Sequence, residues 1–367
     1  MKIRLPFPSC DHRIVSLAKD NITAADLAEN SLSFILIENG KISLLPENVS
    51  VAVAEEDYKK LSSCGNYDVF ELFPDGMAQR VCDCASAENV FFVTGACNSN
   101  CVMCPSPAAS RKHCPKPDID LLIEIAKHMP SDLPHITVTG GEPFIAGKDI
   151  FRLFDYCREK FERTEFQILT NGRIFAIKEY CDLLWETVPY RSILGIPLHA
   201  SVASLHDSIT QSSGSFLQTT TGLRNLLSRG CRIEIRIVVN RLNVNDLENI
   251  ALLIADRFPE TAHVTIMAME MTGNAFVNGE QVWIEYRESF SHVKRAIRAL
   301  IRSGIDVTLY NYPLCTVEPE FRTLCAKSIS PEKIRFADVC DGCSVRDACG
   351  GLFAGSYRWE APALKRI

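Results

Sequence analysis

The sequence predicts an α/β fold, a partial barrel of six β/α units between a small N-terminal unit and a cysteine-rich C-terminal extension. From residue 89 onward, apolar runs of strand length alternate with segments of helix length. Repeated β/α units imply a parallel sheet with right-handed crossovers. Glycine or polar residues stand at the expected strand ends, and cysteine, proline and glycine accumulate after residue 310. The functional loops of such a sheet follow the carboxyl ends of its strands.

Residues 1–88 differ from the rest of the chain, because they contain short strand-like runs at 33–37 and 49–53 with a turn at 38–41. This pattern predicts a small α/β or mostly β unit. It assigns no function to that unit.

Residues 89–310 form the expected partial (β/α)6 TIM-like barrel, because buried parallel strands read as continuous apolar runs. The expected strands are 89–94, 135–139, 165–169, 197–203, 232–239 and 263–268, with a further strand at 305–310. The expected helices are 118–129, 148–161, 174–187, 216–229, 246–258 and 281–303.

Composition excludes several classes of protein. Hydrophobic residues make up 47% and charged residues 23%, an ordinary globular mixture. The formal net charge of −6 and the lack of a Lys/Arg run weigh against a nucleic-acid surface, although a local patch for RNA stays open. The first residues lack the apolar core of a signal peptide, and no apolar run reaches the length of a membrane span. Sixteen cysteines in so long a chain then indicate metal or cluster thiolates in a reducing cytoplasm, so we expect a cytoplasmic protein without a membrane partner.

The chemistry-bearing motif is a loop with Cys97, Cys101 and Cys104, spaced C-x3-C-x2-C after the first expected strand. Three thiolates can bind three irons of a 4Fe–4S cluster and leave the fourth iron open, whereas four make an electron carrier. Composition alone would produce this spacing with a chance of roughly 3%, so it needs support from its surroundings.

That support comes from the other expected strand ends. The second strand is followed by Gly140, Gly141, Glu142 and Pro143. Two glycines permit close approach of the backbone to a ligand, and the Glu142 carboxylate could bind an ammonium group; an ordinary turn with a solvated glutamate is the alternative. Arg236, inside the fifth strand, needs an anionic partner, which is either a ligand or a neighbour such as Glu234. Further candidates near strand ends are Asn171, Ser201 and Asn240.

The C-terminal region, residues 311–367, contains a second cysteine set. Cys340, Cys343 and Cys349 follow the pattern C-x2-C-x5-C, and Cys315 lies upstream as a fourth thiolate. Cys325 is an alternative to Cys315. Four cysteines also suit a structural zinc site, so zinc stays open as the alternative occupant.

With these motifs, the sequence resembles the radical S-adenosylmethionine (SAM) enzymes over about residues 89–310. The resemblance rests on the cysteine triplet and the Gly-Gly-Glu-Pro run one helix later. It implies that Cys97, Cys101 and Cys104 hold a 4Fe–4S cluster whose open iron binds SAM, and that a 5′-deoxyadenosyl radical abstracts a hydrogen from the substrate. It further implies that the Gly-Gly-Glu-Pro run contacts the methionine amino group, that residues 267–272 lie against adenine, and that Ser201 with Arg236 or Asn240 contacts the ribose and carboxylate. The C-terminal cysteines resemble the SPASM and twitch auxiliary domains, which implies a second 4Fe–4S cluster.

Finer features resemble the C-type maturase of the His-Xaa-Ser system. They are His206-Asp207 after the fourth expected strand, the run 310–315 and the run 349–353. This resemblance implies a ribosomally made peptide or protein precursor as substrate, a companion radical SAM protein and an electron donor such as a flavodoxin or ferredoxin. Two other hypotheses are a radical SAM enzyme acting on a small molecule or RNA, and a non-catalytic zinc protein, which the Gly-Gly-Glu-Pro run disfavours.

Overall fold

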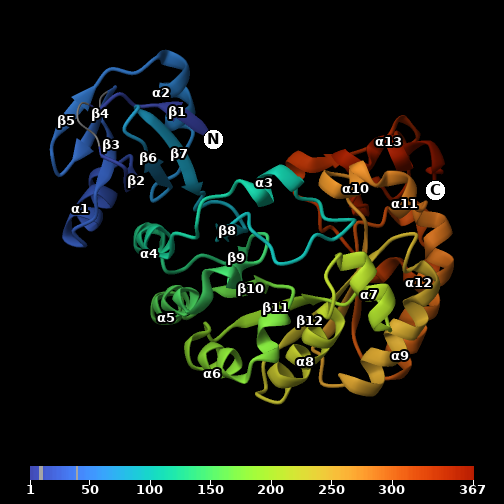
Figure 1. The fold of residues 1–367 in the computed structure, drawn as a ribbon. Helices are drawn as coiled ribbons and strands as arrows, with labels where there is room; N and C mark the ends of the chain where they lie inside the picture. Colours follow the sequence, from blue (N-terminus) through green and yellow to red (C-terminus); the bar gives the residue numbers. More distant parts are fainter. Residues whose placement is uncertain (8–10, 39) are drawn as a thin grey trace.

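The centre of the molecule is a curled parallel sheet of eight strands (Figure 1). The structure is a computed structural model and describes residues 1–7, 11–38 and 40–367. Neighbouring strands follow each other in sequence, from β8 at one edge to β15 at the other. The strands are β8 (Asn89–Phe92), β9 (His135–Thr139), β10 (Glu165–Leu169), β11 (Ser192–Pro197), β12 (Ile233–Val239), β13 (His263–Ala268), β14 (Val307–Tyr310) and β15 (Cys325–Ala326). The predicted half-barrel is therefore confirmed.

Helices cover the convex face of this sheet, as Figure 1 shows. They are α4 (Ile119–His128), α5 (Ile150–Lys160), α6 (Lys178–Thr187), α8 (Ser215–Leu227), α9 (Leu247–Arg257) and α12 (Tyr286–Arg302). Along β12, Ile233, Ile235 and Ile237 belong to the hydrophobic core, whereas Glu234 and Arg236 lie on the opposite, concave face. The sheet thus presents an apolar side to the helices and a partly polar side to the interior of the half-barrel.

Two sequence-based boundaries are wrong by about five residues. The fourth barrel strand is β11, Ser192–Pro197, and not 197–203; residues from Ala203 onward begin the helix α7 (Ala203–Thr210). The apolar residues continue past Pro197, and for this reason residues 197–203 were predicted as the strand. The last long helix, α12, begins at Tyr286 and not at 281, because the short helix α11 (Gly279–Val282) precedes it. Ser201 therefore lies in a loop after β11, and His206 and Asp207 lie in α7.

The N-terminal residues form a separate seven-stranded mixed sheet with two helices, in the order β1-β7-β6-β2-β3-β4-β5. The strands are β1 (Lys2–Arg4), β2 (Arg13–Ala18), β3 (Phe34–Glu38), β4 (Lys41–Leu45), β5 (Val49–Val51), β6 (Val69–Leu72) and β7 (Met77–Cys82), and the helices are α1 (Asn21–Glu29) and α2 (Glu55–Ser62). The predicted turn at 38–41 includes Asn39, which lies outside the described residues. Its flanks, Glu38 and Lys41, pair as an antiparallel hairpin.

This N-terminal unit packs against the barrel through buried polar contacts between Ser16 and His128 and through apolar side chains. Ser16 Oγ lies 2.9 Å from Nδ1 of His128, the last residue of α4, and both residues are buried. Ile14, Val69 and Cys82 join the barrel's hydrophobic core. The two units are therefore connected by a packed interface.

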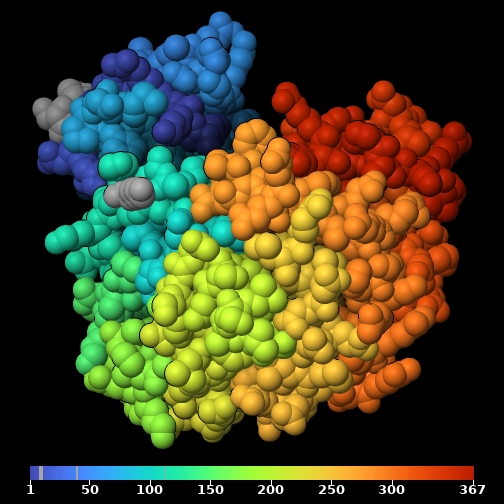
Figure 2. All heavy atoms as spheres, turned by 45° about the vertical axis from the view of Figure 1, so that its right-hand side comes forward, coloured from blue at the N-terminus to red at the C-terminus, as the bar shows by residue number. Residues whose placement is uncertain are grey.

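The C-terminal extension consists of short elements, among them β16 (Ile334–Arg335), β17 (Leu352–Phe353) and α13 (Tyr357–Glu360). Figure 2 shows it and the N-terminal unit as two protrusions on the same end of the molecule. Three further short helices, α3 (Ala108–Lys112), α10 (Gly273–Val277) and α11, lie on the same side of the sheet as this extension in Figure 1. In the part of the chain that the structure describes, no helix is both long and apolar enough to span a membrane.

Candidate active site at the carboxyl edge of the half-barrel

The loops after β8 and β9 are joined backbone to backbone. The Gly141 N–H donates to the Thr94 carbonyl oxygen at 2.7 Å, and the Glu142 N–H donates to the Ala96 carbonyl oxygen at 2.8 Å. A Cβ atom on Gly141 would lie 2.3 Å from the Ala96 oxygen, and one on Gly140 would lie 2.4 Å from the Thr94 oxygen. No side chain fits at either position, so the two glycines allow the Gly-Gly-Glu-Pro loop to hold the start of the cysteine loop.

The Glu142 carboxylate is buried and bonded to the protein itself. Its Oε1 accepts from the Phe144 N–H at 3.1 Å and from Thr170 Oγ1 at 2.8 Å, and its Oε2 accepts from the Asn171 N–H at 2.7 Å. Burial raises the pKa of this carboxyl group, and the three donors act in the opposite direction. Three of its roughly four acceptor positions are filled. Glu142 therefore ties the loops after β9 and β10 together, and its contact with a ligand ammonium stays a prediction.

Arg173, in the same turn as the predicted residue Asn171, holds the middle of the cysteine loop. Its Nη1 donates to the Asn98 carbonyl oxygen at 2.6 Å and lies 3.0 Å from Ser99 Oγ. Asn171 adds a side-chain bond from its Nδ2 to Asn98 Oδ1 at 2.6 Å. Sequence reasoning missed Arg173, because nothing marks an arginine in a turn as the partner of a loop more than 70 residues earlier.

A second set of contacts fixes the other half of the cysteine loop from the segment after β13. Asn274 donates through Nδ2 to the Cys101 carbonyl oxygen and through its backbone N–H to the Cys104 carbonyl oxygen, each at 2.9 Å. Gly273, with φ of 57°, allows this approach, because a Cβ there would lie 2.4 Å from the Pro105 oxygen. The loop conformation is thus specified from both sides of the half-barrel.

The three thiols are half-buried on this fixed loop. Burial raises the pKa of Cys97 and raises that of Cys101 to about 12, so both are protonated when no metal is bound. Among the described residues, no three His, Cys, Asp or Glu side chains meet in the way that holds a single metal ion. A 4Fe–4S cluster gives each iron its own thiolate, so three such ligands do not need to converge on one point. The donor set therefore fits a cluster with one open iron.

A mainly apolar cavity of about 270 Å³ opens beside these thiols. Cys101 and Cys104 form part of its wall, and residues 267–270 form another part. The remaining residues that line it are Met103, Pro105, His199, Val238, Asn311 and Phe353. Thioether and aliphatic groups of this kind suit the face of an aromatic ring. The structure thus brings the predicted stretch 267–272 next to two of the three predicted cluster ligands.

His199 is the unusual polar residue of this cavity. It is buried, and its Nδ1 has no hydrogen-bond partner in the described part of the chain. Burial lowers its pKa to about 3, and the neighbouring His206 ring, 5.6 Å away, contributes to the same shift. His199 is therefore neutral at pH 7, and it contributes to the cavity wall while its buried Nδ1 has no partner among the described residues. Sequence reasoning did not single out His199, because a core or surface role was equally open for it.

The other predicted contact residues are bonded within the protein. Ser201 donates through its N–H and its Oγ to the Asp246 carboxylate at 2.6 and 2.7 Å. Asn240 is buried and accepts the Leu242 N–H on its side chain at 3.0 Å, so it shapes the turn after β12. The strand-end pattern indicated neither the distant Ser201–Asp246 pair nor the turn contact of Asn240.

Arg236 forms the ion pair that was the alternative to a ligand contact. Its Nη1 lies 3.2 Å from Glu234 Oε2, and its guanidinium stands 5.9 Å from the centre of the Tyr310 ring. Its Nη2 lies 3.6 Å from the sulfur of Met267, which lines the cavity. Arg236 therefore lies on the concave face, next to the cavity, with most of its donors unused.

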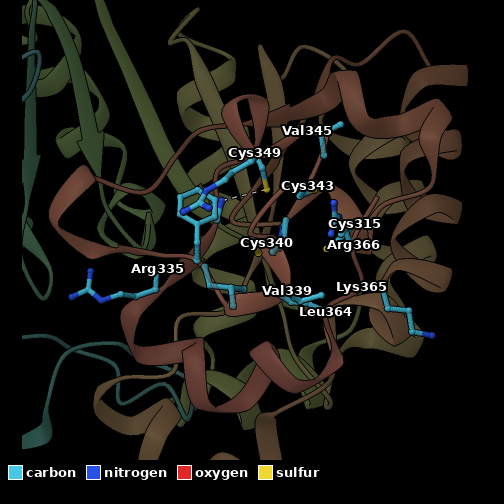
Figure 3. Close-up of a pocket in the computed structure, with 15 residues that line it drawn as sticks. Cys315, Arg335, Val339, Cys340, Cys343, Val345, Cys349, Leu364, Lys365 and Arg366 are labelled. Atoms are coloured by element: carbon cyan, nitrogen blue, oxygen red, sulfur yellow. Dashed lines mark hydrogen bonds between the residues drawn. The ribbon is translucent and has the colours of Figure 1, made fainter.

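The C-terminal cysteines meet at a second place. Cys315, Cys340, Cys343 and Cys349 all line one cavity, shown in Figure 3, and Cys325 is not among its lining residues. The Leu314 N–H donates to Cys349 Sγ at 3.4 Å. Backbone donors, first that of Ile367, lower the pKa of Cys343, whereas burial raises that of Cys340. Such N–H contacts to sulfur are typical of cluster environments.

The two cysteine sites are physically connected. Phe353 follows the last of the four C-terminal cysteines by four residues and lines the cavity beside Cys101. Ser356 Oγ accepts from the Met271 N–H at 3.1 Å and donates to the Met269 carbonyl oxygen at 3.0 Å. The C-terminal extension thus forms part of the wall of the first site.

A parallel half-barrel with a C-x3-C-x2-C loop fixed at its carboxyl edge is the arrangement expected from the resemblance to the radical SAM enzymes. Residues 91–254 match the model of the radical SAM superfamily. This match includes the cysteine triplet and the Gly-Gly-Glu-Pro run, so residues 91–254 carry a radical SAM superfamily domain.

Two curated relatives match parts of the chain. The Fe-coproporphyrin III synthase of Methanosarcina barkeri is 28% identical over 221 residues, which is 59% of this chain and 52% of that protein. The antilisterial bacteriocin subtilosin biosynthesis protein AlbA of Bacillus subtilis is 30% identical over 119 residues, 32% of this chain and 25% of that protein. The chain thus spans about half or less of the length of these relatives.

Solved structures with a similar arrangement have low sequence identity. Streptococcus suis SuiB bound to S-adenosylmethionine is 12% identical with a TM-score of 0.49, over 70% of this chain and 55% of that chain. Native anSMEcpe with bound AdoMet is 12% identical with a TM-score of 0.47, over 60% of this chain and 63% of that chain.

Proposed function

We propose that this protein is a maturase that cleaves SAM reductively and modifies a ribosomally made peptide or protein with the resulting 5′-deoxyadenosyl radical. The observation that carries the proposal is the site at the carboxyl edge, where Cys97, Cys101 and Cys104 lie on a loop fixed from two sides, and two of them, Cys101 and Cys104, border the 270 Å³ cavity. A 4Fe–4S cluster bound there would supply the electron for SAM cleavage.

In this proposal the chain's own residues position SAM. Met103 and residues 267–270 provide an apolar surface for the adenine, and His199 offers a ring nitrogen to its polar part. Arg236 lies next to that wall, so its guanidinium could bind the carboxylate of SAM while it stays paired with Glu234. Phe353 and the methionine side chains exclude water from the cavity.

The proposal of a peptide substrate rests on two further observations. The four C-terminal cysteines share one cavity, as expected for an auxiliary cluster of the SPASM or twitch kind, and the relative AlbA is named for bacteriocin biosynthesis. We extend the proposal to a precursor with His-Xaa-Ser repeats, a companion radical SAM protein and a flavodoxin or ferredoxin as electron donor.

A small-molecule substrate is the second candidate. The longer of the two curated matches is to a protein named Fe-coproporphyrin III synthase. Incubation with a His-Xaa-Ser peptide and with a coproporphyrin, each followed by mass spectrometry, distinguishes the two candidates. A change in the peptide's mass that requires SAM supports the maturase, and a change confined to the porphyrin replaces it.

The test of the radical chemistry uses protein purified without oxygen. Iron, sulfide and zinc are measured, and 5′-deoxyadenosine is assayed after adding dithionite and SAM. We expect about eight irons per chain, because two 4Fe–4S clusters hold four each. Cys101→Ala should abolish SAM cleavage, whereas Cys343→Ala should keep some cleavage and lose substrate modification. A zinc-only protein, or one that never forms 5′-deoxyadenosine, contradicts the proposal.

A further inference from the structure

The cavity of the four C-terminal cysteines has a cationic rim, defined here as Arg335, Arg346, Lys365 and Arg366. All four side chains are exposed and line the same cavity as the cysteines. No aspartate or glutamate is among its described lining residues. This local excess of positive charge stands out in a chain whose formal net charge is −6.

The rim has an inner and an outer part. Arg346 pairs with Asp341 at 2.5 Å and lies over the Phe336 ring at 5.0 Å, and Arg366 lies against Gly342, where a Cβ would stand 2.9 Å from its Nη2. These two side chains belong to the wall of the cysteine loop. They can offset the charge of bound thiolates.

The outer part of the rim consists of Arg335 and Lys365, which do not belong to the wall of the cysteine loop. Figure 3 shows these two side chains pointing away from the cysteines on opposite sides of the cavity. Among the described residues, Arg335 donates to carbonyl oxygens of its own turn, Glu332 O at 2.9 Å and Ile334 O at 2.7 Å. In the part of the chain that the structure describes, neither residue forms an ion pair. Two cations without counter-charges therefore flank the mouth of a thiolate site.

We propose that this cationic rim is the docking surface for an acidic one-electron carrier of the flavodoxin class, and that electrons enter the protein through the C-terminal cysteine site. The inference rests on the proposed function, in which the four cysteines hold an iron–sulfur cluster. One electron passes from the reduced flavin to that cluster, so the flavin is oxidised by one electron, and no bond forms or breaks.

Physical considerations favour this occupant. Electron-transfer complexes are small and short-lived, so they depend on complementary charge around the redox centre more than on a large apolar interface. Opposite charges also raise the association rate, and salt suppresses this effect. The wall that joins the two sites, formed by Phe353 and Ser356, gives the entering electron a packed route toward Cys101.

The test compares the full-length holoenzyme with the double variant Arg335→Glu/Lys365→Glu. The control is Arg163→Glu/Arg232→Glu, which reverses two exposed charges on the loops before β10 and β12, at the opposite end of the barrel. The dissociation constant for flavodoxin is measured at low and at physiological salt. The rate of oxidation of reduced flavodoxin and the dithionite-driven formation of 5′-deoxyadenosine are measured beside it.

We expect the rim variant to bind flavodoxin about tenfold or more weakly at low salt, with a smaller salt dependence, because two attractive charges become repulsive. Its iron content and dithionite-driven activity should equal those of the wild type, and the control variant should behave as wild type throughout. Unchanged flavodoxin binding overturns the docking surface. So does an equal loss with flavodoxin and dithionite, which would show that the outer rim serves the cluster itself.

Failure of the proposed function is visible separately. If the wild type contains no C-terminal iron, or forms no 5′-deoxyadenosine with dithionite, the proposed function fails whatever flavodoxin does. If a polyglutamate peptide binds the rim and flavodoxin does not, the rim recognises a peptide and the electron-carrier proposal is overturned.

Discussion

The guanidinium of Arg173 donates to the carbonyl oxygen of Asn98 at 2.6 Å, and so a side chain after β10 fixes the loop that begins at Cys97. The same arginine also binds Gln218 of α8 through its Nε at 2.7 Å. It therefore connects the cysteine loop to a helix of the barrel. The conformation of the cysteine loop therefore depends on contacts outside the cysteine motif.

We predict that Arg173→Gln leaves the barrel folded but reduces iron binding at the first site. Charge-assisted hydrogen bonds contribute roughly 1.5–3 kcal/mol each, so their loss frees the interval between Cys97 and Cys101. The measurements are iron content and the electron paramagnetic resonance signal of the reduced cluster in a Cys343→Ala background. Arg224→Gln, an exposed arginine of α8, is the control. Full iron in the Arg173 variant would show that the clamp is dispensable.

Gly141→Ala should be more damaging than its size suggests. The added Cβ would lie 2.3 Å from the Ala96 oxygen and 2.5 Å from the Gly95 oxygen, and both are backbone atoms that cannot move alone. We expect loss of SAM cleavage with little change in the circular dichroism spectrum. Gly65→Ala is the matched control, because its Cβ meets only one side-chain oxygen at 3.6 Å. Normal SAM cleavage by Gly141→Ala contradicts the close pairing of the two loops.

The sequence was sufficient to predict the half-barrel and the proximity of the cysteine motif to the Gly-Gly-Glu-Pro run. Both predictions follow from local composition, which determines the hydrophobic periodicity and the positions of the strand ends. It was insufficient wherever a residue acts through a distant loop. Asp246 takes the hydrogen bonds of Ser201, and Arg173 reaches Asn98, and neither pairing leaves a local signal. The bounds predicted for β11 were wrong for a different reason, because the apolar run extends past Pro197 into a loop.

His199 offers a test in which stability and ligand binding move in opposite directions. Its buried Nδ1 lacks a partner, and an unsatisfied buried polar atom costs about 1–3 kcal/mol. We predict that His199→Leu unfolds at an equal or higher temperature but binds SAM more weakly. Thermal unfolding and equilibrium binding of SAM to the reconstituted protein check the two effects. A merely structural histidine would lose stability and leave the SAM affinity of the folded protein unchanged.

Cys315 and Cys325 should differ as ligands of the C-terminal site. Cys315 lines the cavity together with Cys340, Cys343 and Cys349, whereas Cys325 lies in β15, paired with Leu309 of β14. We predict that Cys315→Ser lowers the iron content by about four atoms per chain, the content of one cluster, and that Cys325→Ser keeps it. Iron analysis of both variants after anaerobic reconstitution decides this. The reverse result would assign the fourth ligand to Cys325.

His128 should make the interface between the N-terminal unit and the barrel sensitive to acid. Its ring is buried against Ser16, and burial lowers its pKa from the usual 6.5 to about 4. Between these two values the unfolded chain binds the proton and the folded chain does not, so the free energy of unfolding falls as pH decreases from about 6.5 to about 4. The loss from this residue reaches at most about 3 kcal/mol, and His128→Gln should remove that part of the slope. Urea unfolding at several pH values measures this pH dependence, and His113→Gln, which replaces an exposed histidine, is the control. An unchanged slope in the His128 variant would show that other groups cause the acid sensitivity.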